Sequence, residues 1–464
     1  MAPQRFGRSA LLLSAALAVV WVACVPVERN QARTSEDTVP RKSAPVDYSA
    51  PGPYPVGVTE LDIGPSRTTP SCATEGGSAP PNCEQSNRTA IVYYPASASS
   101  DANGTRELSG YVLHELVPPP LRSAIPPQLD EHVSYDAPVL VDAPANHEAP
   151  FPLVLHSHDT NSDPRINSNL LLQVASWGFV VAAPVHSDRT PLTRPAQATP
   201  DQLRPLTDSP SEDVRDTLTA LRVANVTPDQ PLAGAVNFEQ IAVTGVGAGA
   251  LTALKLLNDP VIDTAIVWSP ATPAPLEALV SLDPSARATE LRDPARVGTP
   301  PAKPTLLIVA ERDTVTPAAG ASVLYEWLAP PKRLATINGA GHSSFTDLCP
   351  AVRSRGGYRQ YAFTWPALIS ALWSLDDGCI DGYLEPGLAR QAVHHLIVAQ
   401  LRWVFGLDDD DVSLSPTWLH QRLGALGEYA TESTDLDSTT GPMETATASI
   451  VSPTPTHRLE DRSP

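Results

Sequence analysis

Asp313 and His342 are residue types that can hold and transfer a proton, and each follows a short apolar run. Asp313 comes shortly after residues 306–310, and His342 ends the sequence Asn-Gly-Ala-Gly-His. A carboxylate beside an imidazole fixes the tautomer of the ring and stabilises the imidazolium that forms when the ring takes a proton. A lone Asp in a turn usually caps backbone groups, so the prediction depends on both residues lying at strand ends of one sheet. Together they predict a general base and its acid partner.

A glycine-rich turn precedes both residues in the chain. The apolar run 241–246 leads into alternate glycines, Gly245, Gly247 and Gly249, and a segment with leucines at helical spacing follows. A strand, a tight turn and a helix in this order present the nucleophilic serine of the motif Gly-x-Ser-x-Gly, and the acid and the histidine follow it in the chain. The outer glycines are present here. The central position, Gly247, has no side chain that could act as a nucleophile.

Glycines close together also occur in phosphate or dinucleotide loops and in plain structural turns. The spacing in this chain differs from G-x-G-x-x-G, and no Lys-Ser or Lys-Thr pair follows as it does in a P-loop. We therefore expect no bound cofactor.

Short β-branched runs recur along the chain and predict the strands that carry these residues. Several of the runs are apolar throughout, as is expected of strands that are buried on both faces. The predicted strands are 89–94, 152–156, 178–183, 240–244, 263–268 and 304–310. Amphipathic stretches alternate with them, clearest at 211–224, and a closing helix is predicted over 388–403. This alternation predicts an α/β protein with a mostly parallel, doubly wound sheet flanked by helices. Two Pro-rich insertions, 117–150 and 271–302, are expected to form loops or caps over the sheet edges.

The N-terminus has the order of a secretory signal. Arg5 and Arg8 precede a small, apolar stretch that ends at Cys24, and the stretch is short for a membrane span. The segment 21–24, Trp-Val-Ala-Cys, resembles a bacterial lipobox, which is cut before a cysteine that becomes lipidated. An ordinary signal cut near Cys24 is the alternative. We expect a chain that is exported and lipid-anchored to a bacterial membrane, at the outer membrane or the periplasmic side.

The predicted organisation is a signal peptide at 1–23, a Pro-rich tether at 24–53, one α/β domain at 54–430 and a disordered tail at 431–464. The formal net charge is −19, and loss of the two arginines in the signal makes it −21. An acidic chain of this kind is an unlikely partner for nucleic acid.

Five cysteines fit export into an oxidising compartment. With Cys24 lipidated, the local pairs would be Cys72 with Cys83 and Cys349 with Cys379. Four cysteines allow three connectivities, and free buried thiols are a further alternative.

The chain resembles the branch of the α/β-hydrolase superfamily that contains platelet-activating factor acetylhydrolase-like and dienelactone hydrolase-like bacterial esterases. The resemblance covers about Tyr54 to Phe405. The segments that carry it are Gly-Pro-Tyr-Pro-Val-Gly at 52–57, Val-Tyr-Tyr-Pro at 92–95, Pro-Leu-Val-Leu-His-Ser-His at 152–158, Trp-Gly-Phe-Val-Val-Ala-Ala-Pro-Val-His at 177–186 and Gly-His-Ser-Ser-Phe-Thr-Asp-Leu-Cys at 341–349. The resemblance implies that Asp313 is the triad acid, that His342 is the base and that Gly247 stands at the serine.

The expected oxyanion loop also departs from the family. A Ser-His-Gly pattern is usual there, whereas this chain has Ser157-His158-Asp159. The hole aims backbone N–H groups, such as that of Ala248, at developing negative charge, and a carboxylate at Asp159 would oppose this unless it is turned away or protonated.

Three functions remain open from the sequence. The first is a catalytically impaired relative of carboxylic-ester hydrolases that binds a small ester or lipid-like ligand. The second is an active serine-type ester hydrolase with a displaced nucleophile, for which the hydroxyls of Ser157, Ser343, Ser344 and Thr244 are the candidates. The third and least favoured is a metal-dependent hydrolase using the histidines at 156, 158 and 186 together with Asp159, although their spacing matches metal motifs only in part. We therefore expect no metal.

Overall fold

The computed structural model describes residues 45–65, 87–97, 106–116, 130–148, 150–187, 209–271, 300–361, 374–408, 412–423 and 427–432, together with residues 122, 127 and 189. The predicted signal, the lipidation site Cys24, the pair Cys72 and Cys83, most of the insertion 271–302 and the tail after residue 432 lie outside these residues.

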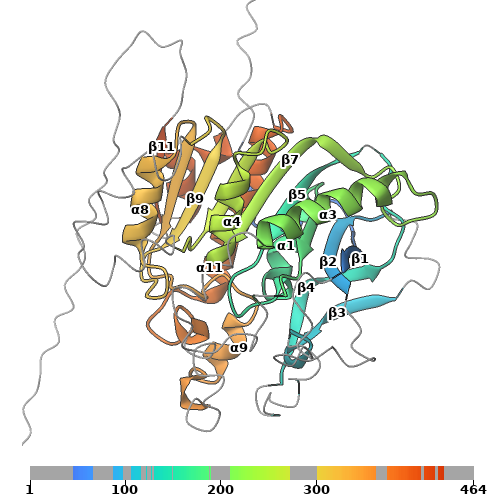
Figure 1. Cartoon of the computed structure of the whole chain (residues 1–464). Coiled ribbons are helices and arrows are strands. Elements are labelled where there is room, and N and C mark those ends of the chain that lie inside the picture. Colours follow the sequence, from blue (N-terminus) through green and yellow to red (C-terminus); the bar gives the residue numbers. More distant parts are fainter. Residues whose placement is uncertain are drawn as a thin grey trace, which may run out of the picture. The chain divides into compact units, whose positions relative to one another are not determined.

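The described strands form one mixed, mostly parallel sheet of eleven strands in the order β11-β10-β9-β8-β7-β5-β6-β2-β1-β4-β3 (Figure 1). In chain order these are β1 (Val56–Pro65), β2 (Asn87–Pro95), β3 (Glu107–Val112), β4 (His132–Val141), β5 (Phe151–Ser157), β6 (Val180–Pro184), β7 (Val236–Val246), β8 (Thr264–Trp268), β9 (Thr305–Ala310), β10 (Lys332–Ile337) and β11 (Gly427–Glu432). The six central strands from β6 to β10 pair in parallel, and antiparallel pairs lie toward both edges.

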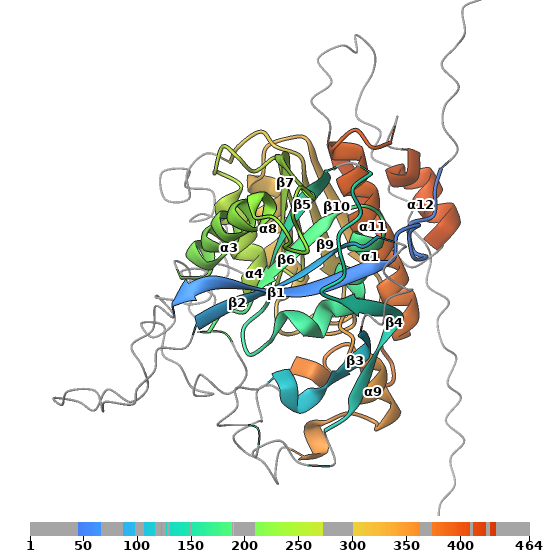
Figure 2. The ribbon, with the colours of Figure 1, turned by 90° about the vertical axis from the view of Figure 1, so that its right-hand side faces the viewer.

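Helices cover both faces of this sheet. They are α1 (Ser168–Ser176), α3 (Ser209–Val226), α4 (Ala248–Leu256), α8 (Ala318–Trp327), α9 (Cys349–Ser354), α11 (Pro386–Val404) and α12 (Pro416–Leu423). Figure 2 shows α3, α4 and α8 on one side of the sheet and α1 and α11 on the other.

The core consists of one apolar layer on each face of the sheet. In β5, Val154 packs in the layer under α1 and α11, whereas Leu153 and Leu155 pack in the layer under α3, α4 and α8. This follows from the alternation of side chains along a strand. Each fully buried Val or Leu contributes about 1.5–3 kcal/mol relative to exposure, so the strands need apolar residues on both faces. All seven residues of β5 are buried.

The predicted α/β class and the mostly parallel sheet are confirmed. All six predicted strands correspond to observed strands, 211–224 lies within α3, and 388–403 lies within α11. The central strands were recognisable because double burial demands long apolar runs.

The insertion 117–150 differs from the predicted loop, because it contains β4, which pairs with β1 and β3 at the sheet edge. Half of the residues in β4 are exposed, so its sequence lacks the apolar run that marked the central strands. At the other edge β11 pairs with β10 and crosses the predicted boundary between domain and tail at residue 431.

The predicted tether also ends earlier than residue 53. Tyr48 is 1 % exposed and belongs to the core layer beneath α11, and its backbone N–H donates to Nδ1 of His395 at 3.1 Å. Gln173 donates to the carbonyl of Tyr48 at 2.7 Å. Residues around Tyr48 are therefore part of the folded domain.

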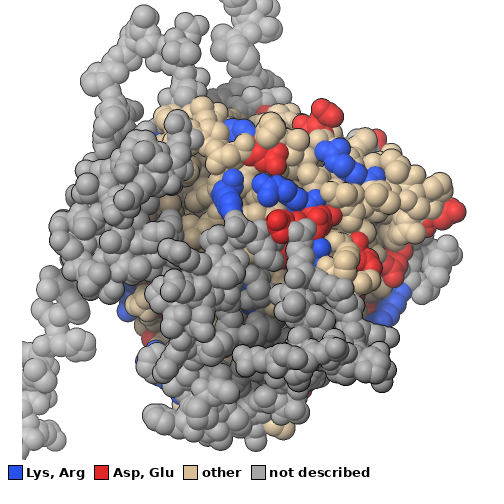
Figure 3. Space-filling view, viewed as in Figure 1, with Lys and Arg blue, Asp and Glu red and all other residues tan. Residues whose placement is uncertain are grey.

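Two observations concern the charge of the surface and the hydropathy of the helices. On the face drawn in Figure 3, acidic and basic side chains lie next to one another rather than in a patch of one sign. Among the helices that the structure describes, none is both long and apolar enough to cross a membrane.

Candidate functional site

The predicted site residues come together at one edge of the sheet. Asp159 follows β5, Gly247 follows β7, Asp313 follows β9 and His342 follows β10. Because these strands run parallel, their carboxyl ends meet at the same edge, which is where open α/β sheets place their ligands. The topology thus unites residues that are far apart in the chain.

Gly245, Gly247 and Gly249 lie at the junction of β7 and α4, and each has a steric reason to lack a side chain. A Cβ at Gly245 would lie 2.2 Å from the carbonyl oxygen of Gly249, and a Cβ at Gly249 would lie 1.9 Å from that of Ser157. Both positions therefore exclude a side chain. Gly247 has φ 56° and ψ −120°, a conformation that L-residues adopt only with strain. The predicted turn between strand and helix is present.

The carboxylate of Asp159 fills the space that a side chain at position 247 would need. A Cβ on Gly247 would lie 2.1 Å from Cγ of Asp159 and 2.2 Å from both of its oxygens. Oδ1 of Asp159 accepts hydrogen bonds from the backbone N–H groups of Ala248 and Thr160, each at 2.7 Å. From the sequence, the carboxylate of Asp159 was expected to oppose the negative charge that develops in an oxyanion hole. In the structure the carboxylate is itself the anion that these N–H groups bind.

His342 is hydrogen-bonded on both ring nitrogens to carboxylates. Nδ1 donates to Oδ2 of Asp313 and Nε2 donates to Oδ2 of Asp159, each at 3.0 Å. Burial alone would lower the pKa of His342, but the hydrogen bonds and charges of Asp159 and Asp313 outweigh it and raise the pKa to about 10. The ring is therefore an imidazolium at neutral pH, held between two negative charges.

The two carboxylates differ in access to solvent. The side chain of Asp313 is 0 % exposed, whereas that of Asp159 keeps 21 % exposure. Removal from water opposes ionisation of both, yet their bonds to His342 and to backbone N–H groups hold the pKa of each below its usual value. Both are anionic at neutral pH, and Asp159 is the one that solvent reaches.

Thr316 supports Asp313, a role that was not predicted from the sequence. Its backbone N–H donates to Oδ1 of Asp313 at 2.6 Å, and its Oγ1 lies 2.7 Å from Oδ2 of Asp313 and 3.2 Å from Nδ1 of His342. The spacing Asp-x-x-Thr is a signal for such a turn, because an Asp side chain often caps backbone groups two or three residues ahead. Thr316 lies on the acid side of the ring and orients it.

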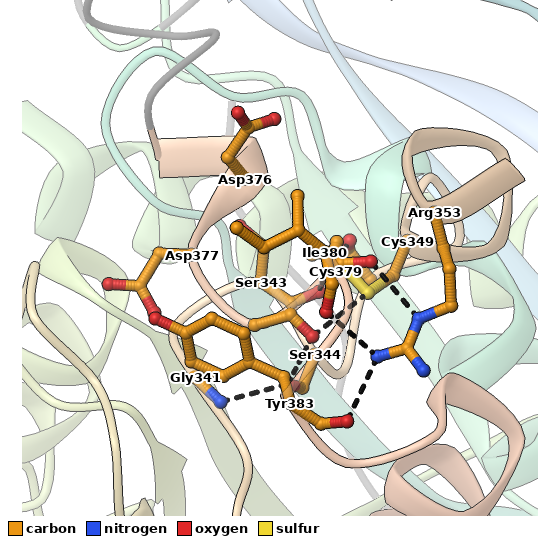
Figure 4. The surroundings of a disulfide bond; sticks show 12 residues. Gly341, Ser343, Ser344, Cys349, Arg353, Asp376, Asp377, Cys379, Ile380 and Tyr383 are labelled. Atoms are coloured by element: carbon orange, nitrogen blue, oxygen red, sulfur yellow. Dashed lines mark hydrogen bonds between the residues drawn. A yellow bond between two sulfur atoms is a disulfide. The ribbon is translucent and has the colours of Figure 1, made fainter. Parts of the chain in front are cut away.

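A second residue that was not predicted, Asp377, positions the loops that carry Asp313 and His342. Its Oδ1 accepts from the backbone N–H of His342 at 3.0 Å, and its Oδ2 accepts from that of Thr314 at 2.8 Å. The predicted pair Cys349 and Cys379 forms a disulfide, which ties the segment of Asp377 to α9 (Figure 4). No local pattern distinguishes Asp377 from a surface carboxylate, because its role depends on two loops that meet only in the fold.

The hydroxyls that were candidates for a displaced nucleophile are bonded elsewhere. Oγ of Ser343 donates to the carbonyl of Ser374 at 2.7 Å, and Oγ of Ser344 donates to that of Gly378 at 3.0 Å. Oγ1 of Thr244 lies 3.1 Å from Nδ1 of His156. Among the described residues, none of these hydroxyls bonds to His342.

Ser157 belongs instead to a second, separate network. Its Oγ donates to Nε2 of His186 at 2.9 Å, and Nδ1 of His186 donates to Oδ2 of Asp213 at 2.9 Å. Asp213 also pairs with the guanidinium of Arg88. Burial, followed by the positive charge of Arg189, holds the pKa of His186 well below its usual value, so this ring is neutral.

The three histidines that were candidates for metal ligands, at positions 156, 158 and 186, also contact other groups of the protein. His156 stacks on Trp268 with 5.4 Å between ring centroids, and burial lowers its pKa to about 3. His158, predicted in the oxyanion loop, donates from Nδ1 to the carbonyl of Asp159 and accepts the backbone N–H of His186 at Nε2. Within the described part of the chain, no group of three or more His, Cys, Asp or Glu is arranged to hold a metal ion.

Comparison with protein-family models gives no match for this chain, and no curated protein is significantly similar to it in sequence.

Proposed function

We propose that this chain is an exported, envelope-anchored protein of the α/β-hydrolase fold, related to carboxylic-ester hydrolases, that lacks serine-dependent ester hydrolysis. The observation that carries this proposal is the carboxylate of Asp159 in the space of a side chain at Gly247. The chain order of turn, acid and histidine and their common sheet edge support the relationship to the hydrolases.

Loss of serine-type activity follows from two properties of the site. First, the turn offers no hydroxyl, and removing the nucleophile of such a triad typically lowers turnover by about a millionfold. Second, a general base must be unprotonated at the working pH, whereas His342 carries a proton up to a pKa of about 10. The array of Asp159, His342 and Asp313 therefore supplies neither a nucleophilic hydroxyl nor an unprotonated base for ester hydrolysis. A small ester or lipid-like molecule would be bound and not cleaved.

The test of this proposal restores the family pattern at both altered positions. We compare the wild type with Gly247→Ser, Asp159→Gly and the double variant, using p-nitrophenyl esters of short and long acyl chains. The single Gly247→Ser variant should stay inactive, because its Cβ would collide with Asp159. The double variant should gain about 100-fold or more in ester turnover, since it has a hydroxyl, a free base and open N–H groups.

Adding His342→Ala to the double variant is the matched control and should abolish the gained activity. Ester turnover by the wild type that disappears with His342→Ala would refute the proposal, and it would point to the alternative of a displaced nucleophile.

The envelope anchor is a separate part of the proposal, and it depends on the N-terminal sequence alone. Cys24→Ser should release the protein from the membrane fraction, because lipid chains supply the membrane affinity. Unchanged membrane retention of this variant would contradict lipidation at Cys24.

A further inference from the structure

We propose that Asp347 forms a proton-sensitive contact between the loop that carries His342 and the N-terminus of α1, closed when Asp347 is protonated and weakened when it ionises. This device goes beyond the loss of serine-type hydrolysis proposed above. It concerns how two loops of the site are held together, and it uses a carboxyl group outside the array of Asp159, His342 and Asp313.

Asp347 makes two hydrogen bonds that join the two loops. Its backbone N–H donates to the carbonyl of Ile166 at 2.9 Å, and its Oδ2 accepts the backbone N–H of Asn169 at 3.0 Å. Ile166 and Asn169 come shortly after Asp159 in the chain, and Asp347 comes shortly after His342. The contact therefore joins the same two segments that the bond between Asp159 and His342 joins.

Asp347 supplies an acceptor that the N-cap residue of α1 does not. Asn167 makes no side-chain hydrogen bond to the first turn of the helix. Both polar atoms of its side chain are buried and have no partner among the described residues. The first N–H groups of a helix have no partner within the helix, so an acceptor from another segment stabilises them. Loss of the Asp347 contact would therefore release the first turn of α1.

The surroundings of Asp347 disfavour its ionised form. Asp347 is 5 % exposed, and its Oδ1 is buried with no hydrogen-bond partner among the described residues. A carboxylate that is removed from water with so few donors is poorly compensated, whereas the neutral acid loses less. Burial raises the pKa of Asp347 to about 7, and the hydrogen bonds from Asn169 offset only part of this effect.

The charges near Asp347 are paired with one another. Arg390 on α11 lowers the pKa of Asp347 and Asp136 on β4 raises it, and these two side chains pair at 3.4 Å. In the segment before α1, Asp163 pairs with Arg165 at 2.8 Å. Burial therefore remains the main cause of the raised pKa.

The tyrosines around Asp347 do not supply a charge. Burial raises the pKa of Tyr111 on β3 and of Tyr135 on β4, and the negative charge of Asp347 adds to this. Both hydroxyls therefore stay neutral across the range in which Asp347 titrates. The hydroxyl of Tyr111 is itself buried without a partner among the described residues, so it does not stabilise the carboxylate.

Ionisation shifts the balance between the closed and the open contact. In the open form Asp347 is in water, and its pKa returns to about 3.8. Because the closed form has the higher pKa, opening becomes about tenfold more frequent for each pH unit between about pH 4 and pH 7 and then levels off. The sign is opposite to that of Asp159 and Asp313, whose lowered pKa values favour the closed array as the pH rises.

The first measurement is hydrogen–deuterium exchange of the purified full chain from about pH 5 to about pH 8, read by mass spectrometry in peptides that cover 163–173 and 342–349. Each rate is divided by the intrinsic exchange rate at that pH. In the wild type, exchange in both segments should rise about tenfold per pH unit up to about pH 6.5 and level off above about pH 7. Peptides from β5 should lack this rise, which separates local opening from global unfolding.

Asp347→Asn removes the charge and keeps the shape of the side chain. Its carbonyl can still accept the N–H of Asn169, so exchange in both segments should be about 100-fold slower than in the wild type at pH 7. Asp263→Asn is the matched control, because Asp263 also accepts a backbone N–H, from Ile241 at 2.8 Å, but is partly exposed. This control should keep the pH dependence of the wild type. The same pH dependence in Asp347→Asn would overturn the proposal.

Arg390→Gln keeps the carboxyl group and changes the charge beside it. The midpoint of the exchange profile should move up by about 0.5 pH unit or more, because the positive charge that lowers the pKa of Asp347 is gone. A midpoint that stays or falls would contradict titration of Asp347. Neither measurement involves ester turnover, so failure here leaves the proposed function standing. Ester hydrolysis by the wild type would refute that function and leave the exchange results unchanged.

Discussion

Two histidines near the carboxyl ends of the strands, His342 and His186, are each hydrogen-bonded on both ring nitrogens, yet they lie in opposite electrostatic environments. His342 lies between the carboxylates of Asp159 and Asp313 and is charged. His186 lies between the hydroxyl of Ser157 and the carboxylate of Asp213 and is neutral. By residue type, the second array is the serine, histidine and aspartate set of a hydrolase.

Burial and neighbouring charge decide what each array can do. Ser157, His186 and Asp213 are all at most 1 % exposed, and the guanidinium of Arg189 lies 3.3 Å from Oγ of Ser157. This array joins β5, the segment after β6 and α3, and no substrate can reach the hydroxyl. Asp159 is partly exposed, and its carboxylate lies against the turn before α4. The residue types of a triad therefore do not by themselves locate an active site, because access for the substrate and position at the strand ends are also required.

The largest expected difference between the arrays concerns stability. Asp213→Ala should lower the free energy of unfolding by about 3–5 kcal/mol, because it removes the buried carboxylate that pairs with both Arg88 and His186 and leaves Arg88 with the more exposed Asp216. Asp159→Ala should cost less, about 1–2 kcal/mol, since His342 keeps Asp313 and the freed N–H groups are open to water. Urea denaturation of both variants measures these losses in the free energy of unfolding. Equal losses would mean that the two arrays contribute equally to stability.

A smaller effect is expected on the titration of the two rings. Asp159→Asn should lower the pKa of His342 by about one unit or more, because it removes one of the two carboxylates that raise it. His186 should stay neutral and show no titration near neutral pH in either protein. NMR titration of the ring signals measures both, and a pKa of His342 that is unchanged in the variant would contradict the ion cluster.

The same shift has a consequence for stability with a definite sign. A pKa that folding raises contributes stability that is complete below about pH 6.5, and this contribution is lost as the pH rises toward 10. The lowered pKa values of Asp159 and Asp313 contribute stability that is lost as the pH falls below about 3.8. The stability difference between the wild type and Asp159→Asn should therefore shrink toward both ends of this range.

The smallest expected effect is the absence of labelling at Ser157. A fluorophosphonate probe should leave the wild type unlabelled, because the hydroxyl of Ser157 is sealed from solvent, and it should label the Asp159→Gly, Gly247→Ser double variant at position 247. Labelling of Ser157 in the wild type would show that the buried array opens, and it would revive the displaced-nucleophile alternative.

The fold was predictable where burial leaves a strong sequence pattern. Strands covered on both faces, such as β5 and β9, contain long apolar runs, and they were located from the sequence. The strand β4, which lies next to the edge strand β3, was not located, because half of its residues are exposed and it has no continuous apolar run. The pairing of Cys349 with Cys379 was predictable as a local pair. The hydrogen bonds that Asp377 accepts from the backbone of Thr314 and of His342 were not predictable.

For the site, the sequence was enough to predict that a turn with Gly247 at its centre, Asp313 and His342 each follow a strand of one sheet, which are β7, β9 and β10. The reason is that parallel strands bring their carboxyl ends to one edge whatever the loops between them contain. The direction in which the carboxylate of Asp159 points was not predictable from the sequence and is seen in the fold. Because Gly247 leaves a space beside backbone N–H groups and a charged ring, an anion from the neighbouring loop is stabilised there. That choice depends on contacts between distant segments, since Asp159 and His342 are separated by 183 residues in the chain.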